Sequence, residues 1–222
     1  MTRIRDAATV LVVRDADDCG IEVLLLLRTS TLDFSPGAHV FPGGAVDDTD
    51  GAEETARVCR GHDDASASAA LGLTSGGQAF FVAAIRECLE EAGIVLGVEP
   101  ESVAPIAARR TAIARGEATF AEVVAGEGVT VALDALVPFG HWITPPGGTR
   151  RYDTRFFLCV APEGQAPSPD DHEAVAAGWY RPADVLAAAA RGEMTLILPT
   201  QRSLEAIADA ASVAALFKDV AA

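Results

Sequence analysis

The sequence predicts a single α/β domain in which helices accompany a mixed β-sheet. Its 222 residues suffice for one large domain, because a chain of this size buries roughly 70% of its unfolded surface on folding. β-rich runs and helical periodicities follow one another without strict βαβ alternation, which favours a mixed sheet. No internal repeat and no linker divides the chain.

The first half of the chain is predicted to contain a hairpin, a glycine turn and a long helix. The β-rich runs 8–13 and 21–27 flank a polar turn and are expected to pair as a hairpin. Residues 39–46, H-V-F-P-G-G-A-V, are expected to form a short strand that runs into the glycine turn. Apolar residues recur at helical spacing over 78–92, and Gly93 stands where a C-cap glycine belongs.

Between these elements, residues 47–77 are polar, small and acidic. Such a stretch is typical of an insertion and not of a core element. One short helix is expected within it, over residues 53–59.

The second half is predicted to supply the remaining strands and most of the helices. Residues 94–97 are expected to form a strand, and 102–125 two Ala-rich helical segments broken at Gly116. The Pro- and Asp-rich stretch 163–171 is expected to be a loop. The other expected elements are strands at 139–144, 152–160 and 174–180, a helix at 182–191 and terminal helices within 198–217.

Composition and charge exclude several functional classes. The formal net charge of −15, from 17 basic and 32 acidic residues, argues against a nucleic-acid partner, which needs a basic surface. No apolar run approaches the roughly 18 residues of a membrane span, and the first residues lack the apolar stretch of a signal peptide. The four cysteines form no metal-binding or disulfide pattern. We therefore expect a cytoplasmic protein with no membrane partner, and any phosphorylated substrate would need a divalent cation against this charge.

Three glutamates on the predicted helix 78–92 are the strongest functional signal. Glu87, Glu90 and Glu91 are spaced i, i+3 and i+4, so their carboxylates share one helix face. Two carboxylates about 4 Å apart repel by roughly 4 kcal/mol at an effective dielectric of about 20, so three need a counter-ion. Mg²⁺ or Mn²⁺ prefers such oxygen ligands, and Arg86 can orient the carboxylate of Glu90. The alternative is a solvated acidic helix face.

The glycine turn and the glutamate helix together resemble a known pattern. R-E-C-L-E-E-A-G-I at 86–94 resembles the second half of the Nudix box, Gly-x5-Glu-x7-Arg-Glu-U-x-Glu-Glu-x-Gly-U, where U is bulky and apolar. In that family the first glycine ends an F-P-G-G-like turn, which is Gly44 here. Gly44 stands 28 residues before position 72, where an uninterrupted box would place it, so the resemblance implies an insertion. Gln78 then occupies the place of the first glutamate, and Glu53 or Glu54 is its candidate displaced equivalent.

This resemblance implies a fold and a reaction class. The expected fold is a Nudix α/β/α sandwich with a mixed sheet, formed by 1–222 as one domain, with 47–77 as an insertion inside the box and 102–125 as a helical addition. Nudix enzymes hydrolyse diphosphates linked to another moiety, usually with Mg²⁺ or Mn²⁺. A Nudix pyrophosphohydrolase acting on a small-molecule diphosphate is therefore expected, and the additional helices are a candidate contact for a homodimer.

A second resemblance concerns the substrate. The stretch 24–44 is similar to the coenzyme A signature of some Nudix hydrolases, although its second arginine falls on Asp33. With the interrupted box, W-I-T-P-P, R-R-Y-D-T-R-F-F-L-C and a late L-P-T, the sequence most resembles the peroxisomal coenzyme A diphosphatase branch. Coenzyme A or acyl-coenzyme A is the substrate that this implies. ADP-ribose, dinucleotides and NTPs are alternative substrates, and a non-catalytic, nucleotide-sensing Nudix module is the alternative from another class.

The resemblance also implies roles for individual residues. The expected metal ligands are Glu87, Glu90, Glu91 and Gly44. The expected catalytic residues are Glu90 or Glu87 as proton acceptor, Glu173 as a further candidate, and Arg86 to orient a glutamate. The expected substrate-binding residues are Arg28, Gly43, Gly44 and Arg151, with Arg150 and Arg155 as further candidate phosphate binders. Trp142 and Trp179 are expected in the core.

Overall fold

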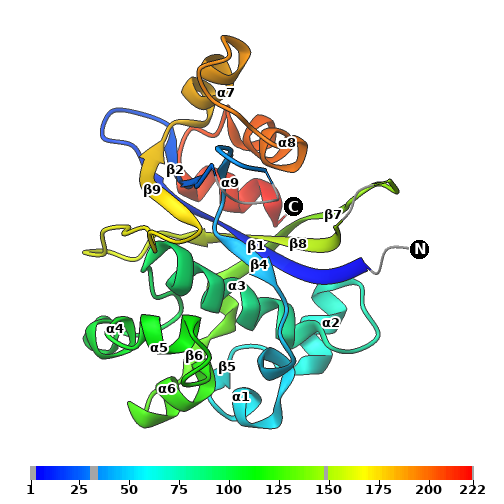
Figure 1. The fold of residues 1–222 in the computed structure, drawn as a ribbon, viewed down its shortest axis with the longest axis vertical. Coiled ribbons are helices and arrows are strands. Elements are labelled where there is room, and N and C mark those ends of the chain that lie inside the picture. Colours follow the sequence, from blue (N-terminus) through cyan, green and yellow to red (C-terminus); the bar gives the residue numbers. More distant parts are fainter. Residues whose placement is uncertain (1–3, 31–34, 148–149, 222) are drawn as a thin grey trace.

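The computed structural model describes residues 4–30, 35–147 and 150–221 and confirms the α/β fold (Figure 1). In these residues a seven-stranded mixed sheet has the order β3-β2-β1-β8-β7, with β4 paired to β1 and β9 to β2. A separate two-stranded ladder joins β5 to β6. The strands are β1 (Ile4–Asp15), β2 (Ile21–Arg28), β3 (His39–Val40), β4 (Gly43–Ala45), β5 (Cys59–Arg60), β6 (Val131–Ala132), β7 (Leu136–Ile143), β8 (Arg151–Val160) and β9 (Ala174–Tyr180).

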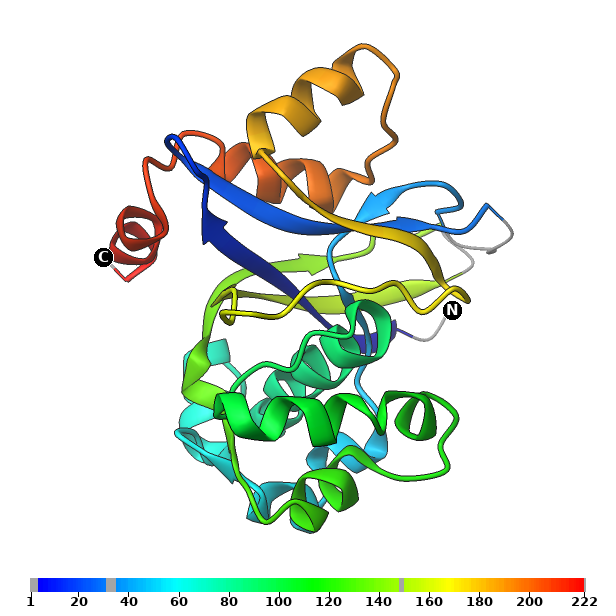
Figure 2. The same ribbon diagram turned by 90° about the vertical axis from the view of Figure 1, so that its left-hand side faces the viewer.

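Helices lie on both sides of the main sheet, which gives three layers (Figure 2). α1 to α6 lie on one side and α7 to α9 on the other. The helices are η1 (Asp48–Gly51), α1 (Glu53–Arg57), α2 (Asp64–Leu71), α3 (Gly77–Ala92), α4 (Pro100–Ala107), α5 (Arg110–Ala114), α6 (Phe120–Gly126), η2 (Leu133–Ala135), α7 (Pro182–Ala190), α8 (Leu198–Ile207) and α9 (Val213–Val220). Across the described residues, no helix has the length and apolar character needed to span a membrane.

β1 lies at the centre of the sheet and is buried on both faces. Val10 and Val12 belong to the core shared with α3, whereas Leu11 and Val13 belong to the core shared with α8. Because helices cover both faces, these four positions are all apolar instead of alternating with polar ones. β1 pairs antiparallel with β2, which confirms the predicted hairpin, and parallel with β8.

α3 confirms the helix predicted over 78–92. It begins at Gly77, where a Cβ would lie 2.3 Å from the backbone nitrogen of Ser68, so the glycine allows close packing on α2. It ends at Gly93, whose left-handed φ of 70° closes the helix as expected. The apolar face of α3 is buried against the sheet, and this fixes where its opposite, acidic face lies.

Two predicted elements differ from the structure. Residues 94–97 are not a strand: the N–H of Val95 donates to Oε1 of Gln165 at 2.8 Å, and its carbonyl accepts from Nε2 at 2.9 Å. A side-chain amide thus satisfies the backbone groups that a neighbouring strand would have paired. Residues 102–125 contribute to three helices instead of two, because a further break precedes α5 and lets Arg110 donate from Nε to the carbonyl of Glu90 at 2.8 Å.

Residues 47–77 fold onto the domain as η1, α1, β5 and α2. The short helix expected at 53–59 is confirmed as α1. Contrary to the expectation of a segment outside the core, Ala67 and Leu71 of α2 are buried in the main core. Arg155 of β8 donates from Nη1 to the carbonyl of Leu71 at 2.8 Å, which ties α2 to the sheet.

Candidate active site

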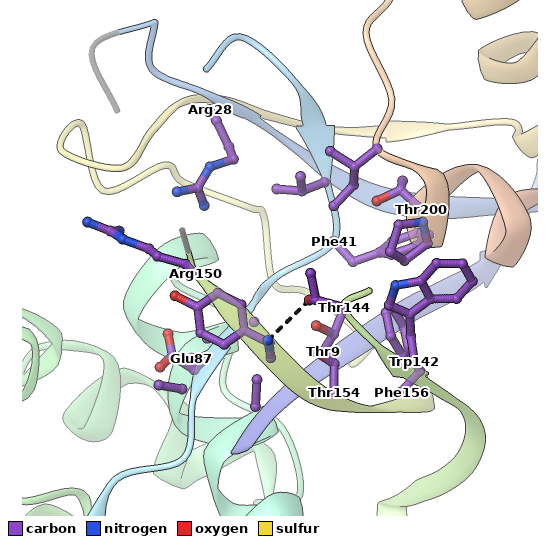
Figure 3. A pocket seen from close by; sticks show the side chains of 18 of the residues that line it. Thr9, Arg28, Phe41, Glu87, Trp142, Thr144, Arg150, Thr154, Phe156 and Thr200 are labelled. Atoms are coloured by element: carbon purple, nitrogen blue, oxygen red, sulfur yellow. Dashed lines mark hydrogen bonds between the residues drawn. The ribbon is translucent and has the colours of Figure 1, made fainter. Parts of the chain in front are cut away.

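A pocket of about 560 Å³ opens between the sheet, the glycine turn, α3 and the start of α8. Figure 3 shows Arg28, Glu87 and Arg150 at one end of it, and Phe41, Trp142, Phe156 and Thr200 at the other. We call the first, with Glu91 and Glu173, the polar end, and the second the apolar end. The pocket therefore offers charged groups of both signs beside an aromatic wall.

α3 presents Glu87 and Glu91 to the polar end. The N–H of Gly43 donates to Oε2 of Glu91 at 2.9 Å. A Cβ on Gly44 would lie 2.5 Å from Oε1 of Glu87, so this position has no room for a side chain. The glycine turn and the two carboxylates therefore fit directly against each other. Glu90 lies one turn from Glu87 and is not among the described pocket-lining residues.

Arg86 is buried beneath these glutamates and makes several charge-assisted hydrogen bonds. Nε and Nη2 each donate to an oxygen of Asp50 at 2.9 Å, and Nη2 also donates to the carbonyl of Ala45 at 2.9 Å. Nη1 donates to Glu87 at 2.9 Å and to Glu90 at 3.1 Å. Burial alone would lower the pKa of Arg86, but the surrounding carboxylates, Asp50 above all, raise it beyond its usual value. Arg86 therefore stays charged and holds two of the three glutamates.

Asp50 is a site residue that the sequence analysis did not identify. It stands six residues after Gly44, which is the Gly-x5-Glu spacing of the box, and its side chain is only 1% exposed. The expectation that Glu53 or Glu54 is the displaced glutamate is wrong, because both are exposed. The extra residues of the box therefore lie between Asp50 and Arg86. Counting forward from Gly44 would have found the position.

Burial raises the pKa of all three α3 glutamates. The pKa of Glu87 rises to about 7 although Arg86 opposes the shift, and the pKa of Glu90 is also raised. The pKa of Glu91 lies well above its usual value, because burial and the charge of Glu87 outweigh the N–H of Gly43. A bound cation would offset the free-energy cost of burying these carboxylates in their charged form. The described residues hold no ready cluster of three metal-binding side chains, but two carboxylates completed by water and substrate phosphates suit Mg²⁺.

Arg28 and Glu173 meet at the polar end. Nη2 of Arg28 lies 3.5 Å from Oε2 of Glu173. Nε of Arg28 is buried and has no hydrogen-bond partner in the described part of the chain. Arg150 lines the same end (Figure 3). The structure thus brings together Arg28, Arg150 and Glu173 with the α3 carboxylates.

Two of the arginines expected to bind phosphate lie elsewhere. Arg151 is not among the described lining residues, and its Nε donates to the carbonyl of Thr144 at 3.0 Å. Arg155 is directed toward α2, as described above. Arg151 begins β8, whose alternate residues Tyr152, Thr154 and Phe156 line the pocket, and Arg150, directly before the strand, lines it as well. Asp33 lies outside the described residues.

The apolar end contains residues that the sequence analysis placed in the core or did not assign. Trp142 packs partly on the core but also lines the pocket with Phe41 and Phe156. Residues 198–200, the L-P-T motif at the start of α8, line it as well. The motifs W-I-T-P-P and L-P-T therefore both contribute to the pocket, although neither has a periodicity that reveals this.

The pattern found in the sequence agrees with comparisons to known proteins. The family model of the NUDT19 Nudix domain matches residues 67–205. The acyl-coenzyme A diphosphatase NUDT19 of Gallus gallus is 31% identical over 82% of this chain, and the Homo sapiens protein of that name is 28% identical over 90%. The chain spans only 62% and 64% of their lengths.

A solved structure supports the same assignment. The crystal structure of a Nudix hydrolase from Alicyclobacillus acidocaldarius aligns with a TM-score of 0.76 and 30% identity. The alignment covers 98% of this chain and 97% of that one, so the whole architecture is shared and not only the glutamate helix. With the family match, the interrupted box and the carboxylate pocket, this chain belongs to the Nudix hydrolase family.

Proposed function

We propose that this protein is a metal-dependent diphosphatase that hydrolyses the pyrophosphate bond of coenzyme A or acyl-coenzyme A. The observation that carries the proposal is the polar end of the pocket, where Glu87 and Glu91 lie together with Arg28 and Arg150. A diphosphate bound there meets carboxylates suited to a divalent cation and guanidinium groups suited to phosphate oxygens. The names of the two NUDT19 relatives support the choice of substrate.

Mg²⁺ or Mn²⁺ is the proposed cofactor. Glu87 and Glu91 are its proposed ligands, with Glu90 and the carbonyl of Gly44 as further ones. When bound, such a cation neutralises phosphate charge and lowers the pKa of a water molecule. Arg86 holds Glu87 and Glu90 through Nη1, and a ligand fixed in this way loses less freedom when it binds a cation.

The remaining residues of the polar end bind the substrate and move the proton. Arg28 and Arg150 bind diphosphate oxygens, and Gly43 and Gly44 allow the substrate to approach the backbone. Glu173 is the proposed proton acceptor for the attacking water, because Arg86 donates hydrogen bonds to the other candidates, Glu87 and Glu90, whereas the 3.5 Å contact between Nη2 of Arg28 and Oε2 of Glu173 is longer than a typical hydrogen bond. Arg150 takes the role expected for Arg151.

Hydrolysis adds one water across the pyrophosphate bond and leaves two phosphomonoesters. From coenzyme A these are adenosine 3′,5′-bisphosphate and 4′-phosphopantetheine. The aromatic surface of Phe41 and Trp142 at the apolar end is the proposed contact for the organic groups on either side of the diphosphate.

The test is product analysis by chromatography and mass spectrometry, with Mg²⁺ or Mn²⁺ and with chelator. The substrates are coenzyme A, acetyl-coenzyme A, ADP-ribose, NADH and a dinucleoside polyphosphate. We expect metal-dependent release of adenosine 3′,5′-bisphosphate, its loss in Glu87→Gln, and no change in Glu122→Gln, an exposed glutamate of α6.

Other outcomes separate the alternatives. Preferential cleavage of ADP-ribose or a dinucleotide keeps the pyrophosphohydrolase and replaces the substrate. Binding of a nucleotide without metal-dependent turnover of any substrate replaces the enzyme with a nucleotide-sensing module.

A further inference from the structure

Glu173 reaches the pocket from the loop that precedes β9, and this loop is hydrogen-bonded to the end of α3. The N–H of Ser168 donates to the carbonyl of Ala92 at 2.8 Å. Gln165 pairs with both backbone groups of Val95. The loop that carries Glu173 is therefore joined to the end of α3 by one backbone hydrogen bond, and to the residues just after α3 by the side-chain amide of Gln165.

The last turn of the loop is organised by the side chain of Asp170. Its Oδ1 accepts from the backbone N–H groups of His172, Glu173 and Ala174 at 3.3, 3.0 and 2.8 Å. Oδ2 lies 3.1 Å from the Glu173 nitrogen. Asp171 adopts a left-handed φ of 63°, which a short polar residue tolerates, and its N–H donates to the carbonyl of Ala174 at 3.0 Å.

A β-bulge constrains the other side of Glu173. The register between β2 and β9 slips between Leu27 and Arg28, which leaves Val175 as an extra, exposed residue. The carbonyl of Glu173 accepts from the N–H of Thr29 at 2.9 Å. Bulges re-aim side chains next to functional sites, and here the backbone of Glu173 is fixed beside the arginine that its carboxylate approaches.

The same turn is linked electrostatically to α3 through Arg110. Nε of Arg110 donates to the carbonyl of Glu90 at 2.8 Å. Burial lowers the pKa of Arg110, and the nearby carboxylates of Asp170 and Asp171 oppose that shift. The turn therefore lies near the positive charge of Arg110, which is hydrogen-bonded to the last turn of α3.

We propose that Asp170 is a positioning residue for Glu173. Its carboxylate holds three consecutive N–H groups, and this fixes the backbone that directs the Glu173 side chain toward the diphosphate beside Arg28. Asp170 is not among the described residues that line the pocket, so its proposed effect on the reaction passes through Glu173 and not through contact with the substrate. The inference rests on the proposed function, because it assigns a role within that reaction.

Two substitutions separate the role of Asp170 as a hydrogen-bond acceptor from the role of its negative charge. Asp170→Ala removes the acceptor, whereas Asp170→Asn keeps an Oδ1 that accepts the same N–H groups. We expect Asp170→Ala to lower kcat about 10- to 100-fold, as mutations of residues that orient a site residue typically do, with KM within about twofold. Asp170→Asn is expected to restore kcat to within about threefold of the parent. Equal kcat for Asp170→Ala and the parent overturns the proposal.

A double-mutant cycle distinguishes positioning from a general structural effect. If Asp170 acts through Glu173, adding Asp170→Ala to Glu173→Gln lowers kcat by less than about twofold further. Additive losses overturn the proposal, as does a Glu173→Gln variant with the activity of the parent. If Asp170→Ala does not fold, Asp170→Ser takes its place, and the same cycle is measured.

As a matched control, an aspartate that accepts a backbone N–H group elsewhere in the protein is replaced with alanine. Asp63 accepts from the N–H of Ser66 at 2.8 Å at the start of α2 and does not line this pocket. Asp63→Ala is expected to leave kcat unchanged, and a loss equal to that of Asp170→Ala overturns the proposal. Failure of the proposed function is distinct, since it is seen as absent turnover in the parent protein.

Discussion

Replacing Asp50 with alanine tests the buried ion pair that replaces the first glutamate of the box. Asp50 and Arg86 are 1% and 6% exposed in their side chains and share two hydrogen bonds of 2.9 Å. Removing one partner of a buried pair costs about 3–5 kcal/mol. Arg86 keeps Glu87, Glu90 and a backbone carbonyl, so we expect the lower end, about 3 kcal/mol.

The expected shift follows from the size of the domain. At about 2–4 °C per kcal/mol for a chain of this length, Asp50→Ala should lower the Tm by about 6–12 °C. The assay is differential scanning calorimetry in chelator, with Asp48→Ala as control, because Asp48 is exposed in the same turn. The control should melt within about 2 °C of the parent. A similarly small shift for Asp50→Ala would refute the assignment of Asp50 as the partner of Arg86.

Three further predictions concern the pocket. Gly44→Ala places a Cβ 2.5 Å from Oε1 of Glu87, so the rate of coenzyme A hydrolysis should fall about 10- to 100-fold while the Tm changes little. A variant with the activity of the parent would contradict the close fit between Gly44 and Glu87. Arg28→Ala should raise KM about 10-fold, since a hydrogen bond to a charged group contributes about 1.5–3 kcal/mol, whereas Arg57→Ala on exposed α1 should not. Burial raises the pKa of Glu87 from 4.5 to about 7, so its proton stabilises the metal-free fold below pH 4.5 and this contribution is lost as pH rises through 7. The Tm in chelator should therefore fall from about pH 5 to 8, and Mg²⁺ should raise it more at pH 8; an equal Mg²⁺ effect at both would count against these carboxylates as the cation site.

Elements with strong local patterns could be predicted from the sequence. The hairpin and α3 follow from β-rich runs and from helical spacing, and the structure contains both. Residues 94–97 have the composition of a strand, but their pairing depends on Gln165, about 70 residues later. A local pattern does not contain that information, and neither does the composition of 47–77 show that Ala67 will be buried in the core.

In the candidate site, too, features set by local geometry could be predicted, and features set by the rest of the fold could not. The spacing of the three glutamates on one helix face could be predicted because helix geometry alone determines it. Whether Arg150 or Arg151 reaches the pocket depends on a one-residue register, since neighbouring side chains point to opposite sides. The aromatic wall cannot be predicted from the sequence pattern, because Trp142 has the same alternating pattern whether it covers a core or lines a pocket.

The placement of charge reconciles a net charge of −15 with an anionic substrate. Arg86 offsets part of the charge of Glu87 and Glu90, while Glu91 is buried against the N–H of Gly43. A divalent cation at Glu87 and Glu91 would interact with these carboxylates at short range, whereas the surface carboxylates act on a phosphate from farther away and through solvent. Arg28 lies at the same end, 3.5 Å from Glu173, where its guanidinium is the proposed contact for a diphosphate oxygen. The acidic composition thus disfavours a bare diphosphate but not one that arrives with its cation.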